Sequence, residues 1–237
     1  MNNSETQTFT LDDTAGYYPQ LADLLTSVAA SHCDVAIDQT THMRWRDIMG
    51  LMRDVDTNAD AGLDRSIITD QLATFDQLSE HYPSLNPESL GPKTHQALQH
   101  RALHILRIGS LISLQDTLRR YTLLRGSEAR HTAYLFSDSA TDAVQQQPAF
   151  KHSFMPLLER MAISATLLDS VVDAGKDFAG GKITLQLRSI DRLKILGLAS
   201  REAIPVIPAA AHISVLGQLS ISAFLHMKRH LLYGRAK

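Results

Sequence analysis

Two groups of aspartates combine the residue type and the spacing that could do chemistry. Asp56 and Asp60 are four residues apart, and Asp169, Asp173 and Asp177 repeat that spacing twice. On a helix, residues four apart lie on one face, so each group would project its carboxylates together. Like charges at this spacing destabilise a helix by about 0.2–0.5 kcal/mol per pair, which a bound cation would offset. Mg²⁺ is commonly held by one or two carboxylates and by substrate phosphate oxygens, so the pattern predicts a metal–diphosphate site.

The elements that must position these carboxylates are predicted to be helices. Apolar residues recur at three- and four-residue spacing, and sustained β-type alternation between turn dipeptides is almost absent. The prolines leave two long uninterrupted runs, 93–147 and 157–204. The pattern predicts an all-α chain with helices at 15–32, 40–56, 65–81, 93–124, 127–146, 150–177, 189–200 and 209–232.

Composition narrows the class of protein. The chain has 237 residues, of which 44% are hydrophobic, so we expect one helical domain over 1–237, with 1–14 as a flexible N-terminal segment. A formal net charge of −2 gives no basic field for nucleic acid, and the single cysteine, Cys33, cannot form an internal disulfide. There is no secretory signal pattern and no apolar run long enough for a transmembrane segment. These features predict a cytoplasmic protein, with a homodimer as a possible assembly.

Two segments resemble the aspartate motifs of squalene and phytoene synthases. Residues 53–60, RDVDTNAD, resemble the first motif, in which an Arg shortly precedes D-T-x-x-D at the end of a helix. Residues 173–185, DAGKDFAGGKITL, resemble the second, D-x-x-x-D followed by an aromatic residue and G-R-x-Y-L-P. The triad at 169, 173 and 177 is also similar to the second metal motif of class I terpene cyclases. The resemblance covers about 44–65 and 150–198.

The second segment departs from the squalene and phytoene synthase pattern at four positions. Val172 replaces an Arg, Asp169 stands where Asn is common, Lys182 replaces an Arg, and Gln186 replaces a Pro. The chain is also shorter than these synthases. These departures argue against head-to-head condensation of two large diphosphates more than they argue against the fold. We therefore favour a synthase that acts on one diphosphate.

The resemblance implies an α-helical bundle of the class I isoprenoid synthase type, in which two aspartate motifs face each other across a central active-site cavity. Mg²⁺ ions would act as Lewis acids that draw diphosphate from an allylic prenyl diphosphate, and the carbocation would need a dry apolar cavity. The implied metal ligands are Asp56, Asp60, Asp169, Asp173 and Asp177, all but Asp169 being also the expected catalytic residues, and Arg53, Lys176 and Lys182 would bind the diphosphate. The favoured activity is that of a terpene synthase, with a prenyltransferase using a second acceptor as the alternative.

A calcium-binding helical interaction protein is the alternative outside enzymes. Residues 54–60, with the pattern D-x-D-x-N-x-D, resemble the start of an EF-hand loop. A loop beginning at Asp54 puts Ala59 where glycine is needed and Arg65 where a bidentate glutamate is needed. A loop beginning at Asp56 fails at the same two positions, so calcium binding remains the less favoured prediction.

Other polar clusters are expected to be structural or solvated. The histidines at helical spacing are His100/His104 and His226/His230, together with His131 in a single Glu128-x-x-His131. The two pairs lack the glutamate of a zinc-protease helix, and a di-iron bundle needs two E-x-x-H motifs. The densest basic patch consists of Arg119, Arg120, Arg125 and Arg130, and we expect it to be a solvated face, with a second phosphate site as the alternative.

Overall fold

The structure is a computed structural model that describes residues 14–60 and 80–208, with side chains over 21–52 and 80–208. Within these ranges every regular element is a helix and no strand occurs, which confirms the predicted all-α fold for this part of the chain. The predicted helices at 65–81 and 209–232 lie outside the described residues, except that residues 80 and 81 form a turn.

The first two helices, α1 (Thr14–Cys33) and α2 (Gln39–Asp60), pack against each other. The carboxylate of Asp38 caps the start of α2, because it accepts a hydrogen bond of 2.7 Å from the Thr41 backbone N–H. It also accepts a hydrogen bond from the Thr141 hydroxyl. Burial would raise the pKa of Asp38, but the hydrogen bonds from Thr141 and Thr41 outweigh it and lower the pKa. Asp38 therefore starts α2 and ties it to a distant part of the chain.

The remaining described elements follow residue 82. In chain order they are η1 (Pro83–Leu85), α4 (Pro87–Leu90), α5 (Pro92–Ser113), α6 (Leu118–Ser139), α7 (Asp142–Gln145), the π-helical turn η2 (Phe150–Phe154), α8 (Met155–Ala179), α9 (Ser189–Ala203) and η3 (Ile204–Val206). The predicted helices at 150–177 and 189–200 correspond to η2 with α8 and to α9. The long helices are thus joined by short connections, as in a helical bundle.

The hairpin of α5 and α6 corrects the predicted division of this region. We predicted helices at 93–124 and 127–146 with a gap at 125–126, but α6 continues through these two residues and the chain turns at 114–117. Leu114 continues the apolar spacing of α5, yet its side chain is 70% exposed because the helix has already ended. Thr117 is extended, with φ −120° and ψ 137°, and α6 starts directly after it.

The first of two apolar cores surrounds Trp45 of α2, which is fully buried. Its ring stacks on Phe154 with 5.5 Å between ring centroids and meets Phe136 edge-on at 6.1 Å. Its indole N–H donates to the backbone carbonyl of Phe136 at 3.0 Å. The neighbouring guanidinium of Arg44, also buried, donates to the carbonyl of Ser139 at 3.0 Å. These contacts fix the first half of α2 against α6 and the start of α8.

The second core lies between α5, α6, α8 and α9. Its buried members are Ile108, Ile112, Tyr121, Ala129, Ile163, Leu167, Val171, Ala174, Ile183, Leu187, Ile195 and Ala199. Ala162 of α8 packs against both cores. The long helix α8 therefore joins the two cores, with its first turns in one and its later turns in the other.

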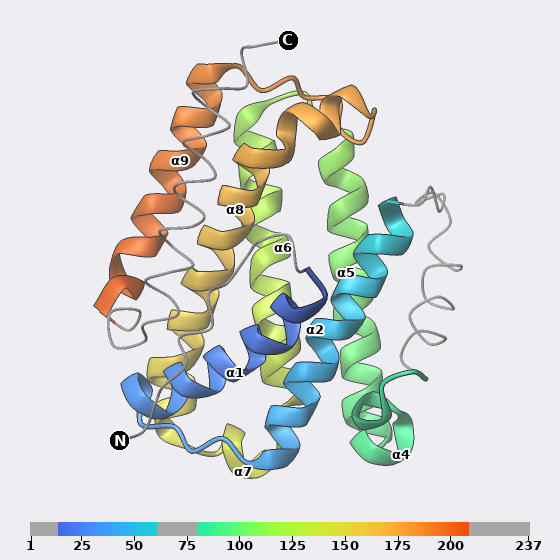
Figure 1. Ribbon diagram of the computed structural model, residues 1–237, viewed down its shortest axis with the longest axis vertical. Coiled ribbons are helices and arrows are strands. Elements are labelled where there is room, and N and C mark those ends of the chain that lie inside the picture. Colours follow the sequence, from blue (N-terminus) through green and yellow to red (C-terminus); the bar gives the residue numbers. More distant parts are fainter. Residues whose placement is uncertain (1–13, 61–79, 209–237) are drawn as a thin grey trace, which may run out of the picture.

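Figure 1 shows how these helices are arranged. The helices α2 and α8 both rise from the lower part of the view to the upper part, whereas α9 descends beside α8. The hairpin of α5 and α6 stands behind them, and α6 packs on both α2 and α8. The carboxyl-terminal turns of α2 and α8, which carry the two aspartate groups, thus lie in the upper half of the bundle.

Candidate functional site

The three aspartates of the second group lie along one helix, as predicted. α8 is uninterrupted from Met155 to Ala179, so Asp169, Asp173 and Asp177 occupy successive turns near one face. The side chain of Asp169 is exposed, and those of Asp173 and Asp177 are half-buried. The stripe therefore lies beside the buried face of α8, with its carboxylates partly or fully accessible to solvent.

The spacing of the stripe limits how it could bind metal. With a rise of 1.5 Å per residue, neighbouring aspartates are about 6 Å apart along the axis, and the outer two are about 12 Å apart. A Mg²⁺ ion binds oxygen at about 2.1 Å, so no single ion could contact all three carboxylates. Among the described residues, no three His, Cys, Asp or Glu side chains lie close enough together to hold a metal ion. A metal site on α8 would need further ligands from the substrate or from another helix.

The loop after α8 is held against the turn between α5 and α6. The backbone N–H of Lys182 donates to the carbonyl of Asp177 at 2.8 Å, which closes the end of the helix. Thr184 donates from its backbone N–H to the carbonyl of Ser113 at 3.1 Å and from its hydroxyl to that of Gln115 at 2.8 Å. The side chain of Lys182 is half-buried, and that of Lys176, one turn before the end of α8, is exposed. Both lysines proposed to bind diphosphate are thus close in sequence to Asp177 on a fixed segment.

Gly181→Ala is expected to destabilise the fold by about 1 kcal/mol, because Gly181 has a φ of +70° that side chains with a Cβ rarely adopt. Gly126→Ala is the matched control: no atom lies within 4 Å of its added Cβ, and alanine in a helix interior is favoured by about 0.5–1 kcal/mol. Urea denaturation would measure both changes. An equal effect of the two substitutions would show that the backbone at Gly181 is not constrained as described.

The first group lies on the last two turns of α2. The backbone is helical through Asp60, so Arg53, Asp56 and Asp60 belong to one helix, which extends one turn beyond the predicted end at residue 56. Their side chains lie outside the described residues. The four-residue spacing of Asp56 and Asp60 thus falls on helical backbone, as the pattern requires.

The packing of the two helices directs both aspartate groups toward one end of the bundle. α2 and the start of α8 meet where Trp45 stacks on Phe154. From there, Asp56 is about 17 Å further along α2, and Asp173 is about 27 Å beyond Met155 along α8. Both helices run away from the stacked rings in the same general direction (Figure 1).

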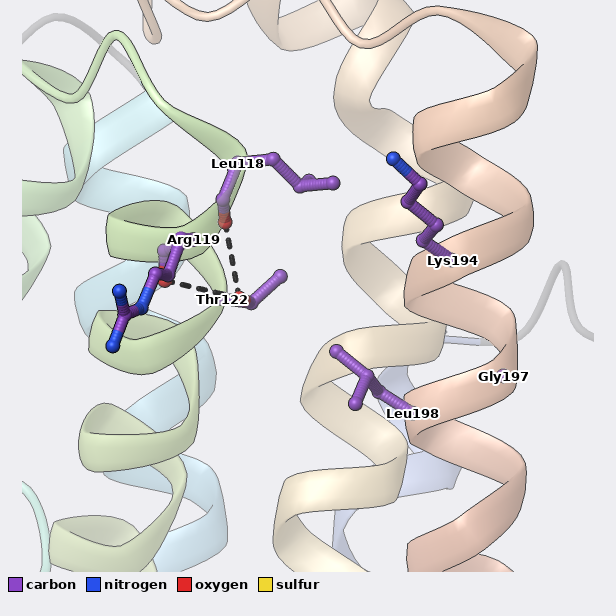
Figure 2. A pocket seen from close by; sticks show the side chains of 6 residues that line it. All are labelled: Leu118, Arg119, Thr122, Lys194, Gly197 and Leu198. Atoms are coloured by element: carbon purple, nitrogen blue, oxygen red, sulfur yellow. Dashed lines mark hydrogen bonds between the residues drawn. The ribbon is translucent and has the colours of Figure 1, made fainter.

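Two hollows of the described part of the chain are open grooves on the second core. The larger, of about 560 Å³, lies between α6 and α9 and is lined by Leu118, Arg119, Thr122, Lys194, Gly197 and Leu198 (Figure 2). The smaller, of about 310 Å³, is lined by Leu111, Gln115, Arg120, Leu123 and Leu124. None of the predicted aspartates lines either groove. The central cavity implied by the resemblance therefore stays a prediction.

A polar network between α5 and α6 includes histidines whose pairing the sequence did not reveal. His104 stacks on His131 of the other helix at 5.0 Å, rather than pairing with His100 on its own helix. Arg101 donates to Nδ1 of His131 at 3.1 Å and forms an ion pair of 2.9 Å with Asp138. Burial, with help from the charge of Arg101, lowers the pKa of His131. Such cross-helix pairs leave no fixed spacing in the sequence that could have identified them.

Acidification is expected to destabilise the protein partly through His131. Because its pKa in the folded state lies below the ordinary value near 6.5, the unfolded chain takes up a proton first as the pH falls. The free energy of unfolding should therefore decrease as the pH drops through about 6.5. In His131→Gln this decrease should be shallower, whereas the exposed His152→Gln should behave like the parent. Urea titrations at several pH values would measure the slopes, and identical slopes for parent and His131→Gln would contradict the assignment.

Arg125 of the predicted basic patch points inward rather than to solvent. Its guanidinium forms an ion pair of 2.9 Å with Glu128 and donates to the Tyr121 hydroxyl at 3.4 Å. Burial would lower the pKa of Arg125, but the carboxylate of Glu128 and the hydroxyl of Tyr121 more than offset it and raise the pKa. Arg119, Arg120 and Arg130 are exposed, as expected for a solvated face, whereas Arg125 is a correction to that expectation. Glu128 is engaged with Arg125, so the sequence Glu128-x-x-His131 is part of a structural network.

No helix in the described ranges is both long and apolar enough to cross a membrane.

Comparison with known proteins adds no family to these observations. No protein-family model, curated protein or solved structure matches the chain.

Proposed function

We propose that the protein is a Mg²⁺-dependent terpene synthase that ionises an allylic prenyl diphosphate and releases diphosphate. The observation that carries the proposal is the uninterrupted helix α8 with aspartates at 169, 173 and 177, combined with a second aspartate pair on the last turns of α2. Both groups lie toward one end of the bundle, which supports a shared site.

The proposed roles follow from the chemistry of diphosphate departure. Asp56, Asp60, Asp173 and Asp177 would hold the Mg²⁺ ions, with Asp169 as a further ligand. Since the stripe on α8 is too long for one ion, the diphosphate oxygens would complete the coordination of each ion. Arg53, Lys176 and Lys182 would add positive charge around the leaving group. When bound, the metal ions supply Lewis acidity, and the protein's residues supply their placement.

The calcium alternative is weakened by the backbone of α2. An EF-hand needs a turning loop that begins at its first aspartate, with a sharp turn at the sixth position. Residues 54–60 instead continue α2 to Asp60, so loop registers beginning at Asp54 or Asp56 would both start on a regular helix. We therefore keep a prenyltransferase, which shares the ionisation step, as the second candidate.

Incubation of the purified full-length chain with geranyl, farnesyl or geranylgeranyl diphosphate and Mg²⁺ tests the proposal. Inorganic diphosphate and the organic extract would be measured together, the latter by mass spectrometry. A hydrocarbon or alcohol formed from one substrate alone supports the synthase. A product that appears only with an added acceptor indicates the transferase instead.

Calorimetry distinguishes the enzyme from a binding protein. The synthase should bind Mg²⁺ appreciably only when a diphosphate is present, because that ligand completes the coordination. Binding of Ca²⁺ without diphosphate, together with unchanged substrate in every incubation, would overturn the proposal in favour of the interaction protein.

A further inference from the structure

The outer face of α9 exposes large apolar side chains, whereas the solvent-facing side of a surface helix usually carries polar ones. Large hydrophobic side chains are exposed at five positions between 190 and 207, namely Ile190, Leu193, Leu198, Ile204 and Ile207. Leu193 is 59% exposed and Ile204 is 62% exposed. The buried side of the same helix, with Ile195 and Ala199, already contacts the second core. The helix is therefore apolar on two sides, and only one of them is covered by the core.

Among the charged side chains of residues 190–207, the exposed ones are cations and the carboxylates are at least half-buried. The two carboxylates are turned inward and paired: Asp191 with Arg188 at 3.0 Å, and Glu202 with Arg160 at 3.2 Å. Asp191 is buried and Glu202 is half-buried. Lys194 and Arg201 are exposed on the outer side, and Arg201 also lies 3.9 Å from the carboxylate of Glu202 at the edge of this face. The exposed face of α9 thus combines apolar and cationic side chains without an exposed carboxylate, although the whole chain has a net charge of −2.

The groove between α6 and α9 extends this face. Figure 2 shows Leu118 and Thr122 directed from α6 toward α9, with Leu198 and Lys194 directed back from α9. The hydroxyl of Thr122 donates to the carbonyl of Leu118 at 3.0 Å within its own helix, so it adds little polarity to the groove. An apolar groove with the cationic side chain of Lys194 at its edge suits a molecule in which an apolar chain is joined to an anionic headgroup.

Charge disfavours the other occupants of this face. In a symmetric dimer through α9, Lys194 and Arg201 would approach the same residues of the second copy, which brings like charges together. The chain's own residues 209–237 contain no aspartate or glutamate, so they offer Lys194 and Arg201 no carboxylate to pair with. An anionic lipid surface complements both the apolar and the cationic side chains.

We propose that the face formed by α9, η3 and the α6–α9 groove docks peripherally onto membranes that contain anionic lipid. Ile190, Leu193, Ile204 and Ile207 enter the boundary between headgroups and acyl chains, and Lys194 and Arg201 contact the lipid phosphates. This surface is separate from the aspartate groups of α2 and α8, and its function does not depend on the proposed diphosphate chemistry.

Co-sedimentation with lipid vesicles tests the proposal on the full-length protein. The probes are vesicles of phosphatidylcholine alone and vesicles of phosphatidylcholine with phosphatidylserine. The charge variant is Lys194→Glu with Arg201→Glu, and the apolar variant is Leu193→Ser with Ile204→Ser. The matched control is Met43→Ser with Arg46→Glu, an exposed hydrophobic and cation pair on α2. Circular dichroism and thermal unfolding confirm that each variant is folded.

The parent protein should bind the phosphatidylserine vesicles and bind phosphatidylcholine alone far less. The charge variant should partition at least about 25-fold more weakly, because the loss of each basic residue at an anionic surface costs about fivefold and the added carboxylates are repelled by the lipid phosphates. The apolar variant should lose about tenfold, and the α2 control should match the parent. Equal binding by parent and both variants, or no binding by the parent, would overturn the proposal. So would sedimentation velocity that shows self-association of the parent abolished by the α9 variants, since the face would then be an interface between copies.

Discussion

Replacing Asp173 by Asn is expected to reduce Mg²⁺-dependent release of diphosphate by about a thousandfold. The substitution keeps the shape of the side chain but removes the charge that would bind the metal ion. Loss of one metal contact to a departing diphosphate corresponds to about 4 kcal/mol of transition-state stabilisation, which is about three powers of ten in rate. The half-buried position of Asp173 on an uninterrupted helix leaves the helical content unchanged. The rate of diphosphate release under saturating Mg²⁺ is the measurement.

Asp34→Asn is the matched control for the same change of charge. Asp34 is exposed after α1 and has a φ of 57°, a conformation that asparagine tolerates well. It should keep the parent rate and the parent stability. If the parent is active and Asp173→Asn retains its rate, Asp173 has no place in the mechanism. The comparison therefore tests the role of Asp173 separately from the question of whether the protein is an enzyme.

Replacing Trp45 by Ala should lower the free energy of unfolding by about 3–5 kcal/mol. The indole is fully buried, and its loss leaves a cavity between Phe136 and Phe154 as well as removing a hydrogen bond. Because typical domains are stable by about 5–15 kcal/mol, this loss is a large fraction of the total. Urea denaturation followed by circular dichroism would measure it.

Trp45→Phe separates the packing contribution from the hydrogen bond. The smaller ring can still stack on Phe154, and the carbonyl of Phe136 keeps a hydrogen bond of 2.9 Å from the Ser139 hydroxyl. We therefore expect Trp45→Phe to lose less than half as much stability as Trp45→Ala. Met43→Ala, at an exposed site on the same helix, should change the stability by less than about 0.5 kcal/mol. Similar losses in all three variants would contradict the central position of Trp45.

Helical periodicity predicted the fold class but not every boundary. The stripe that includes Phe154, Leu167 and Val171 predicted a long helix correctly, because those side chains are buried in one or other of the two cores. The same spacing across Leu111 and Leu114 predicted a continuous helix wrongly, because α5 ends at Ser113 and both leucines are exposed rather than packed in a core. Apolar spacing does not distinguish a core-facing leucine from an exposed one. The pair Asp116-Thr117, a typical helix-starting signal, marked the true turn.

The candidate site was predictable only where it depends on one helix. The spacing of Asp169, Asp173 and Asp177 depends on α8 alone, and its helical geometry is confirmed. The proposed partnership with Asp56 and Asp60 depends on how two helices distant in sequence approach each other, which stays a prediction. Contacts such as the stacking of His104 on His131 depend on tertiary packing in the same way.

The division of the apolar interior into two cores implies that the molecule opens in two cooperative units. The second core takes its buried residues from 108–129 and 163–199, whereas the first draws on residues from Ala22 to Val206, including those at 133–158 between the two parts of the second. Amide hydrogens of α9 and of the later turns of α8 should therefore exchange with solvent together, through an opening that leaves those around Trp45 protected. The aspartate stripe belongs to this second unit. A bound metal–diphosphate complex would consequently slow amide exchange there first, and mass spectrometry of deuterated peptides would detect it before any product is identified.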